Sequence, residues 1–203
     1  MFRALPHRLT TALLTLCLLA PGGASAALLS LVPDSSFATD GQSVAVDLVV
    51  SDLGDFAAPS IGAFSADVIF DIAALSFTDY ALGGLLGDSS AFESADISTG
   101  ANGDNVGLGE ISFLLPGFLN ADQPGSFVLA TLNFTVLALG PGETTVLSVA
   151  PGALLSDALG FVLDTTATRG TITGSTPVPT PATLVLVLSA ALAHQLARRR
   201  RHR

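Results

Sequence analysis

The sequence has no lysine and no tryptophan, and it has one cysteine and one tyrosine in 203 residues. The cysteine is Cys17, and the three histidines, His7, His194 and His202, lie near the two ends of the chain. Residues 27–179 therefore contain no thiol and no imidazole. This excludes a disulfide framework, a zinc site built on Cys or His, and the usual nucleophile and base pairs. The central segment must fold by core packing alone.

Positive charge is also absent from most of the chain. All 17 Asp and Glu residues lie between Asp34 and Asp164, whereas all eight arginines lie outside that interval, and Arg169 is the one arginine within residues 27–179. The net charge is +2 for residues 1–26, −16 for residues 27–179 and +5 for residues 180–203. Contacts to phosphate need clustered Lys or Arg, so this distribution excludes nucleic acid as a partner of the central segment.

Residues 1–26 have the layout of a secretory signal. Two arginines precede the apolar stretch 13–20, and a Pro-Gly-Gly breaker and the sequence Ala24-Ser25-Ala26 follow it. Small residues at positions −3 and −1 fit the pocket of signal peptidase, so we expect a signal helix that is cleaved between Ala26 and Ala27. A retained membrane helix needs about 20 apolar residues and is the weaker interpretation.

The C-terminal segment, residues 175–203, has a Pro-rich linker, an apolar run and a basic end. A hydrophobic helix over residues 182–197 would cover about 24 Å, and arginine side chains can extend to the membrane surface. The positive-inside rule would keep these arginines cytoplasmic and leave the acidic domain outside. The tail is then either a removable signal with transient membrane association or a permanent single-span anchor. The basic residues are Arg198, Arg199, Arg200, Arg201 and Arg203.

Residues 27–174 show the period of two that is typical of half-buried strands. Alternation places Val44, Val46, Leu48 and Val50 on one face, and similar alternation is present in residues 64–70 and 128–136. Gly, Pro, Asn and Asp punctuate these stretches where turns are needed. The pattern predicts one antiparallel β-sandwich domain, an all-β fold. Further strands are expected at residues 28–32, 75–80, 106–115, 144–149 and 170–173.

The tail carries a resemblance to a known sorting signal. The residues Val178-Pro179-Thr180-Pro181-Ala182, the apolar run and the terminal arginines are similar to the PEP-CTERM signal of exopolysaccharide-producing Gram-negative bacteria. Thr180 stands where that family usually has Glu. The resemblance implies export, processing at Val178–Pro181 by an exosortase-type enzyme of the inner membrane, and release to the cell surface or beyond.

The central domain resembles cohesin-like domains, which are related to carbohydrate-binding modules. The resemblance rests on a Gly before an alternating Val strand at residues 41–46 and on a strand that ends in Phe70-Asp71-Ile72 and leads to Leu75-Ser76-Phe77. A later strand over residues 129–136 is followed by a Pro-Gly-Glu-Thr turn, and residues 170–173 fit a last strand. The resemblance implies a cohesin-like jelly roll that acts as a binding module.

Carboxylates are the only acid and base groups that the central segment offers in number. The pairs Asp67 and Asp71, Asp52 and Asp55, and Glu93 and Asp96 could serve a glycoside hydrolase, which needs two carboxyl groups. Exposed acids are expected on any lysine-free exported domain, however. We therefore predict a non-enzymatic protein, with an exopolysaccharide-active hydrolase as the alternative.

Calcium is the one cofactor that this composition favours, because hard cations take carboxylate and carbonyl oxygens. The candidate loop contains Asp96, Asn102, Asp104 and Asn105, and residues 52–55 form a second candidate. Asp71 is expected to be a turn residue that bonds nearby backbone N–H groups, and it is also a candidate binding residue.

Carbohydrate binding would need aromatic platforms. Tyr80 is the one candidate, because the 11 phenylalanines after Phe2 are expected to be mostly core residues. The sequence as a whole predicts an exported surface or biofilm-matrix protein. Its expected partners are an extracellular polysaccharide or another surface protein, and a permanently anchored adhesin is the intermediate case.

Overall fold

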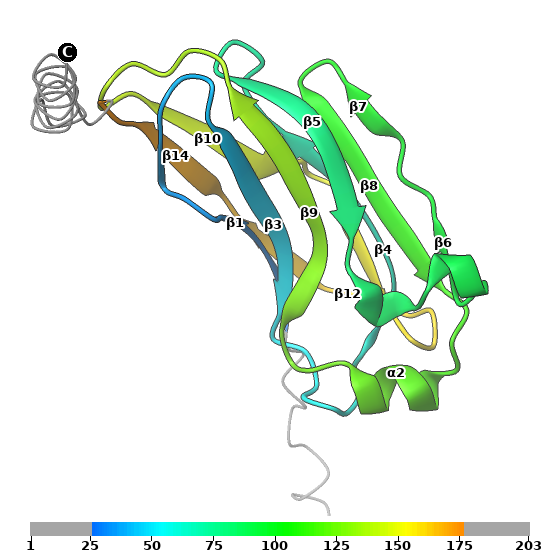
Figure 1. Ribbon diagram of the computed structural model, residues 1–203. Helices are drawn as coiled ribbons and strands as arrows, with labels where there is room; N and C mark the ends of the chain where they lie inside the picture. The colour runs from blue at the N-terminus through cyan, green and yellow to red at the C-terminus, as the bar shows by residue number, and fades with distance from the viewer. Residues whose placement is uncertain (1–25, 177–203) are drawn as a thin grey trace, which may run out of the picture.

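The alternating apolar residues fold into two β-sheets that face each other across a single core (Figure 1). The computed structural model describes residues 26–176. The first sheet contains β1 (Ala27–Pro33), β3 (Ser43–Ser51), β5 (Leu75–Leu82), β9 (Phe127–Val136) and β13 (Thr165–Thr168). The second contains β2 (Phe37–Ala38), β4 (Ile61–Ile69), β6 (Ser94–Asp96), β7 (Gly100–Asn102), β8 (Asn105–Ser112), β10 (Thr144–Val149), β11 (Leu154–Asp157), β12 (Val162–Leu163) and β14 (Gly170–Gly174).

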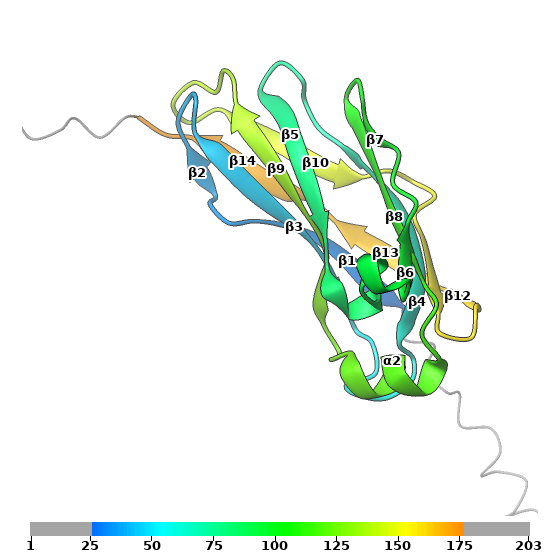
Figure 2. The same cartoon turned by 45° about the vertical axis from the view of Figure 1, so that its right-hand side comes forward.

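The order of the strands sets which edges lie open. The first sheet runs β13-β1-β3-β9-β5, so β5 is one of its edges. In the second sheet, β4 pairs with β8 on one side and with β10 and β11 on the other, and β6 and β7 both pair with the far side of β8. The edge strands β5 and β6 therefore lie on the same side of the sandwich, as the turned view shows (Figure 2).

The predicted alternation is confirmed for the central strands. Val44, Val46, Leu48 and Val50 of β3 are all buried, and in β4 the buried residues alternate with exposed ones. Burying these side chains between two sheets is the main stabilising contribution available to a domain without disulfides. The all-β sandwich predicted from the sequence is therefore correct.

At the start of β9, the prediction of which side chains face the core is wrong. Sequence alternation puts Val128 inside and Leu129 outside, but Leu129 is fully buried and Val128 is only half-buried. The register between β3 and β9 shifts between Leu48 and Val49, which is a β-bulge. A bulge inserts one extra residue and so reverses the alternation on one side of it.

The sheets are mixed rather than purely antiparallel. β1 pairs with β13 in parallel, and β14 pairs with β2 in parallel, while the other pairings are antiparallel. The physical cause is that the chain changes sheets at Arg169, between β13 and β14, and again between β1 and β2. Each crossing leaves a short strand beside a neighbour that runs in the same direction.

One end of the sandwich is closed by α2 (Pro116–Asp122) and by the β11–β12 hairpin, and β14 ends at the opposite end (Figures 1 and 2). Two 3-10 turns, η2 (Gly84–Leu86) and η3 (Ser89–Ala91), connect β5 to β6. Within residues 26–176, no helix is long and apolar enough to cross a membrane. The signal helix and the C-terminal hydrophobic helix predicted from the sequence lie outside the described residues.

Candidate functional site

The two sheets are joined on their open side by a hydrogen bond between Tyr80 and Asp96. Tyr80 lies on β5 opposite Leu132, which is fully buried, so its ring packs against the core. Its hydroxyl donates to Asp96 Oδ2 on β6 at 2.9 Å, and the Ser98 backbone N–H donates to Asp96 Oδ1 at 2.8 Å. The sequence indicated Tyr80 as a candidate for sugar binding and Asp96 as a candidate calcium ligand. The structure brings these two side chains together in one site.

Glu110, on β8, is the cross-strand neighbour of Asp96. It faces Asp96 in the β6–β8 register and Phe64 in the β4–β8 register, and it continues the inward face of Val106 and Leu108. Its side chain is 2% exposed, and its Oε2 has no hydrogen-bond partner. Burial raises the pKa of Glu110, the Ser94 hydroxyl lowers it, and the charge of Asp96 raises it, with a net increase.

The pKa values of the bonded pair move away from each other. The Ser98 hydroxyl lowers the pKa of Tyr80, but partial burial, the bond to Asp96 and the Asp96 charge together raise it above its ordinary value. Burial raises the pKa of Asp96, but hydrogen bonds from Ser98 and Tyr80 outweigh it, so the net pKa is lowered. At neutral pH the bond therefore joins a neutral phenol to a carboxylate.

The sequence did not single out Glu110, although a signal was present. Val106, Leu108 and Glu110 occupy alternate positions of one strand, so the period of two already placed this carboxyl on an apolar face. A charged residue on a core-facing position is unusual and is informative by itself.

The other residues of the predicted calcium loop lie elsewhere. Asn102, Asp104 and Asn105 surround the β7–β8 turn, whereas Asp96 pairs with the other end of β8. Asn105 and Glu110 are five residues apart along β8, which corresponds to about 17 Å of strand. Among residues 26–176, no three His, Cys, Asp or Glu side chains gather closely enough to hold a metal ion.

Asp71 is in a turn, as expected. Its Oδ1 accepts a hydrogen bond from the Ala73 backbone N–H at 2.9 Å. With Glu143 and Thr145 it lines an open hollow of 560 Å³ at the end opposite α2. Glu143 Oε2 accepts from the Gly140 N–H at 2.9 Å, so both carboxylates of this hollow organise backbone turns.

The candidate carboxylate pairs have similar local roles. Asp55 Oδ1 accepts from the Gly125 N–H at 3.1 Å, and Glu93 Oε2 accepts from the Asp88 N–H at 3.1 Å. Asp67 is exposed on the outer face of β4, while Asp71 lies in the turn that follows this strand. The side chains of Asp55, Asp71 and Glu93 therefore hold loops and turns in place.

The expectation that the phenylalanines are mostly core residues is wrong. Four of the 11 are buried and one is half-buried, while six are exposed, and Phe92 is 87% exposed in a left-handed backbone conformation with φ 62°. The exposed ones lie outside the long alternating runs, in loops, turns and short elements, which is the signal that could have identified them. The exposed phenylalanines are Phe37, Phe56, Phe92, Phe113, Phe118 and Phe161.

Exposed apolar side chains gather at the α2 end of the sandwich. Ala63 of β4 lies between Ile111 of β8 and Ser156 of β11, and Ser156 faces Val162 of β12. A hollow of 140 Å³ between α2 and the β11–β12 hairpin includes Leu159 in its lining. We call this surface the apolar end, and its exposed members are Ile111, Phe113, Leu115, Phe118, Leu159, Phe161 and Val162.

The outer face of the first sheet differs from the apolar end because it is polar and internally bonded. The Thr131 hydroxyl donates to Asp47 at 2.6 Å, and the Asn133 amide donates to Asp79 at 2.5 Å. These bonds cross from β9 to its neighbours β3 and β5. Two pairs of polar side chains on this face are therefore already bonded to each other.

Of the predicted processing residues, Ala26 and Ala27 lie within the described part of the chain. Ala27 begins β1, is buried, and donates its backbone N–H to the Asp164 carbonyl at 2.8 Å. The predicted cleavage point therefore coincides with the start of the folded domain. The other predicted processing and topology residues lie outside residues 26–176: Ala24, Val178, Pro179, Thr180, Pro181, Arg198, Arg199, Arg200, Arg201 and Arg203.

Comparison with known proteins relates this geometry to one fold. No protein-family model matches the chain, and no curated protein matches it. Solved structures do match. The sixth cohesin of Acetivibrio cellulolyticus scaffoldin B, solved in complex with a Cel5 dockerin, is 16% identical with a TM-score of 0.58, and the match covers 72% of this chain and 99% of that one.

Two further solved structures agree. CaCohA2 from Clostridium acetobutylicum is 18% identical with a TM-score of 0.59, and the match covers 77% of this chain and 95% of that one. A non-cellulosomal cohesin from the archaeon Archaeoglobus fulgidus is 16% identical with a TM-score of 0.55, over 73% of this chain and 91% of that one. The described residues therefore form a cohesin-like β-sandwich.

Proposed function

We propose that this chain is an exported, non-enzymatic module that binds another protein through its apolar end. The observation that carries the proposal is the concentration of seven exposed large apolar side chains at one end of a cohesin-like sandwich. Contiguous exposed apolar surface on a folded domain marks an interaction site. The Acetivibrio cohesin with the same fold is itself solved with a dockerin, which supports protein rather than sugar as the ligand.

The charge of the domain indicates the chemistry of the partner. The described residues carry all 17 acids of the chain and only Arg169 as a basic residue. Asp122 of α2 and Asp157 of the β11–β12 hairpin border the apolar end. The partner surface should therefore have an apolar centre and a basic rim, since complementary charges speed association and exclude acidic competitors.

Site-specific crosslinking tests this proposal. A photo-crosslinking amino acid at Leu159 in the apolar end is compared with one at Ser76, which is exposed on β5, in the host's own envelope fraction. We expect Leu159 to crosslink one protein reproducibly and Ser76 not to. Identical crosslinking patterns from the two positions would contradict the proposal.

Binding of the crosslinked protein is then measured with purified components. Leu159→Asp should weaken binding about tenfold or more, which corresponds to about 1.4 kcal/mol. Ser76→Asp adds the same charge on the polar side and should leave affinity unchanged. Equal loss of affinity in both variants would attribute the effect to net charge and overturn the assignment of the apolar end.

The proposal places the module on the cell surface or in a biofilm matrix. The support is the signal-like segment before Ala27 and the PEP-CTERM-like residues Val178-Pro179-Thr180-Pro181. Mass spectrometry of the secreted protein should find Ala27 at its N-terminus and a C-terminus near Pro179–Pro181. Surface material that still ends in Arg203 would overturn sorting and identify a permanent anchor. Thr180→Glu restores the usual residue and should be processed at least as completely.

The same proposal assigns no catalytic role to the carboxylates. Asp55, Asp71 and Glu93 each accept a backbone hydrogen bond that shapes a turn or loop. Incubation of the chain with the host's own exopolysaccharide should release no reducing ends. Release above that of a heat-denatured control would favour the hydrolase instead.

A further inference from the structure

We propose that Asp96 and Glu110 hold a hard divalent cation on the open side between the two sheets, with the Tyr80 hydroxyl beside it. This cation site differs from the loop that the sequence indicated. Its second carboxylate is Glu110, within β8, rather than Asp104 in the β7–β8 turn. It goes beyond the proposed protein binding and does not depend on it.

The first argument is the unsatisfied oxygen of Glu110. The side chain is 98% buried, and its Oε2 has no hydrogen-bond partner, whereas buried polar atoms in folded proteins almost always have one. Glu110 and Asp96 are directly opposite each other in an antiparallel pair, so their side chains leave the sheet on the same face. The carboxyl group of Glu110 therefore leaves β8 on the same side of the sheet as that of Asp96.

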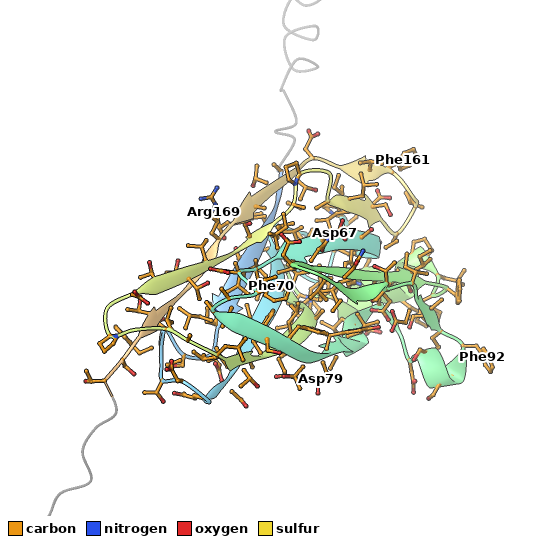
Figure 3. The ribbon with its side chains drawn as sticks, turned by 90° about the horizontal axis from the view of Figure 1, so that it is seen from above. Asp67, Phe70, Asp79, Phe92, Phe161 and Arg169 are labelled. Carbon is orange, nitrogen blue, oxygen red and sulfur yellow. The ribbon has the colours of Figure 1, made fainter. Side chains whose placement is uncertain are left out.

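The second argument is charge. Two facing carboxylates repel each other, and a buried carboxyl group stays ionised only beside a compensating charge. Arg169 is the one basic residue within 26–176, and it follows β13, at the edge of the first sheet opposite to β5. Figure 3 shows Arg169 well away from Asp79, which lies next to Tyr80 on β5. A divalent cation would neutralise the two carboxylates with no protein cation required.

The third argument is the type of donor around the pair. Tyr80 OH bonds to Asp96 Oδ2 at 2.9 Å, and Ser94 Oγ, which is buried beside Glu110, donates to the Gly87 carbonyl at 3.2 Å. These groups are oxygen ligands, as calcium and magnesium prefer, and both ions keep waters where the protein supplies few ligands. Asp96 is exposed, so it gives a cation access from solvent.

The composition of the chain supplies a direct readout. Tyr80 is the only tyrosine and there is no tryptophan, so emission from bound Tb³⁺ that is sensitised at a wavelength beyond phenylalanine absorption must come through Tyr80. The full-length chain in a non-ionic detergent is titrated with Tb³⁺ under excitation of tyrosine. We expect saturable sensitised emission that Ca²⁺ displaces, and a higher thermal midpoint in Ca²⁺ than in chelator.

Three variants decide the assignment. Glu110→Gln should weaken Tb³⁺ binding roughly 10-fold or more, because even an outer-shell partner of a metal site is worth 10- to 100-fold. Asp104→Asn removes a carboxylate of the β7–β8 turn and should change nothing. Wild-type protein without sensitised emission, or Glu110→Gln with wild-type emission, overturns the site. If Glu110→Gln does not fold, the exposed Asp96→Asn replaces it, and unchanged emission in that variant is equally decisive.

Discussion

Glu110 is the single charged residue among the buried side chains of residues 26–176. Burial raises its pKa in the folded state above the ordinary value that it has in the unfolded chain. Between these two values the folded state binds more protons, so stability must fall as pH rises through this interval. The destabilisation caused by ionised Glu110 is absent below the pKa that Glu110 has in the unfolded chain, and it is complete above the pKa that Glu110 has in the folded state.

Replacement of this carboxyl tests that reasoning in protein freed of divalent ions by chelator. Glu110→Gln keeps the shape and removes the ionisation, so it should flatten the fall in unfolding free energy above the unfolded pKa of Glu110. It should also make the variant more stable than wild type at neutral pH. Denaturant titrations at several pH values measure both effects. Parallel stability curves for the two proteins would show that Glu110 does not titrate with folding.

Tyr80 offers a second test at the scale of one residue. The net effect of the Ser98 hydroxyl, burial and Asp96 raises the pKa of Tyr80, so the chain's only phenol should ionise above its ordinary value. Asp96→Asn removes the adjacent negative charge and should lower that pKa in an ultraviolet absorbance titration. Ser76→Asn, on the outer face of β5, is the control and should leave the Tyr80 titration unchanged.

At the scale of elements, α2 is held to the sandwich through Gln123, which is fully buried. Its Oε1 accepts from the Ile61 N–H at 2.6 Å, and its Nε2 donates to the carbonyls of Ile61 at 2.9 Å and Leu85 at 3.0 Å. One side chain thus connects the end of α2 to the start of β4 and to η2.

Gln123→Ala should therefore destabilise the protein by about 1–3 kcal/mol or more, because leaving one buried backbone group without a partner already costs about that much. Asp122→Ala, at the exposed neighbouring position, should stay within about 0.5 kcal/mol of wild type. Chemical denaturation compares the two. A loss that is the same in both variants would show that the Gln123 bonds are replaced by water.

How far the sequence predicts these elements depends on their length. Long strands such as β3 were predicted because their alternation continues for several residues. The seven-residue α2 begins with Pro116 and Gly117 and is too short to show a period of 3.6, and edge strands such as β6 have too few residues to alternate. Tyr80 and Asp96 were each noticed, but their contact joins two sheets, and local sequence carries no signal for it.

At the scale of the molecule, the two ends of the sandwich differ. The apolar end carries α2, while β14 and the exit toward the C-terminal segment lie at the opposite end (Figure 1). A chain held at a membrane by its C-terminus would therefore present the apolar end away from that membrane. The placement of the apolar end and of the C-terminal exit at opposite ends of the sandwich thus agrees with the proposed order of sorting signal, linker and binding surface.

The charge of the whole domain leads to a last prediction, again in chelator. With 17 acids against one arginine in residues 26–176, repulsion among like charges should destabilise the compact state at low ionic strength. The Debye length falls from about 30 Å at 0.01 M salt to about 8 Å at 0.15 M, so NaCl should raise the thermal midpoint over this range and then have less effect. The double variant Asp104→Asn and Asp122→Asn lowers the charge at two exposed positions and should show a smaller rise than wild type. A midpoint that is flat in salt, or an equal rise in both proteins, would mean that the acids are too far apart or too well solvated to repel. The stability of this domain would then depend on its core and on the Glu110 region alone.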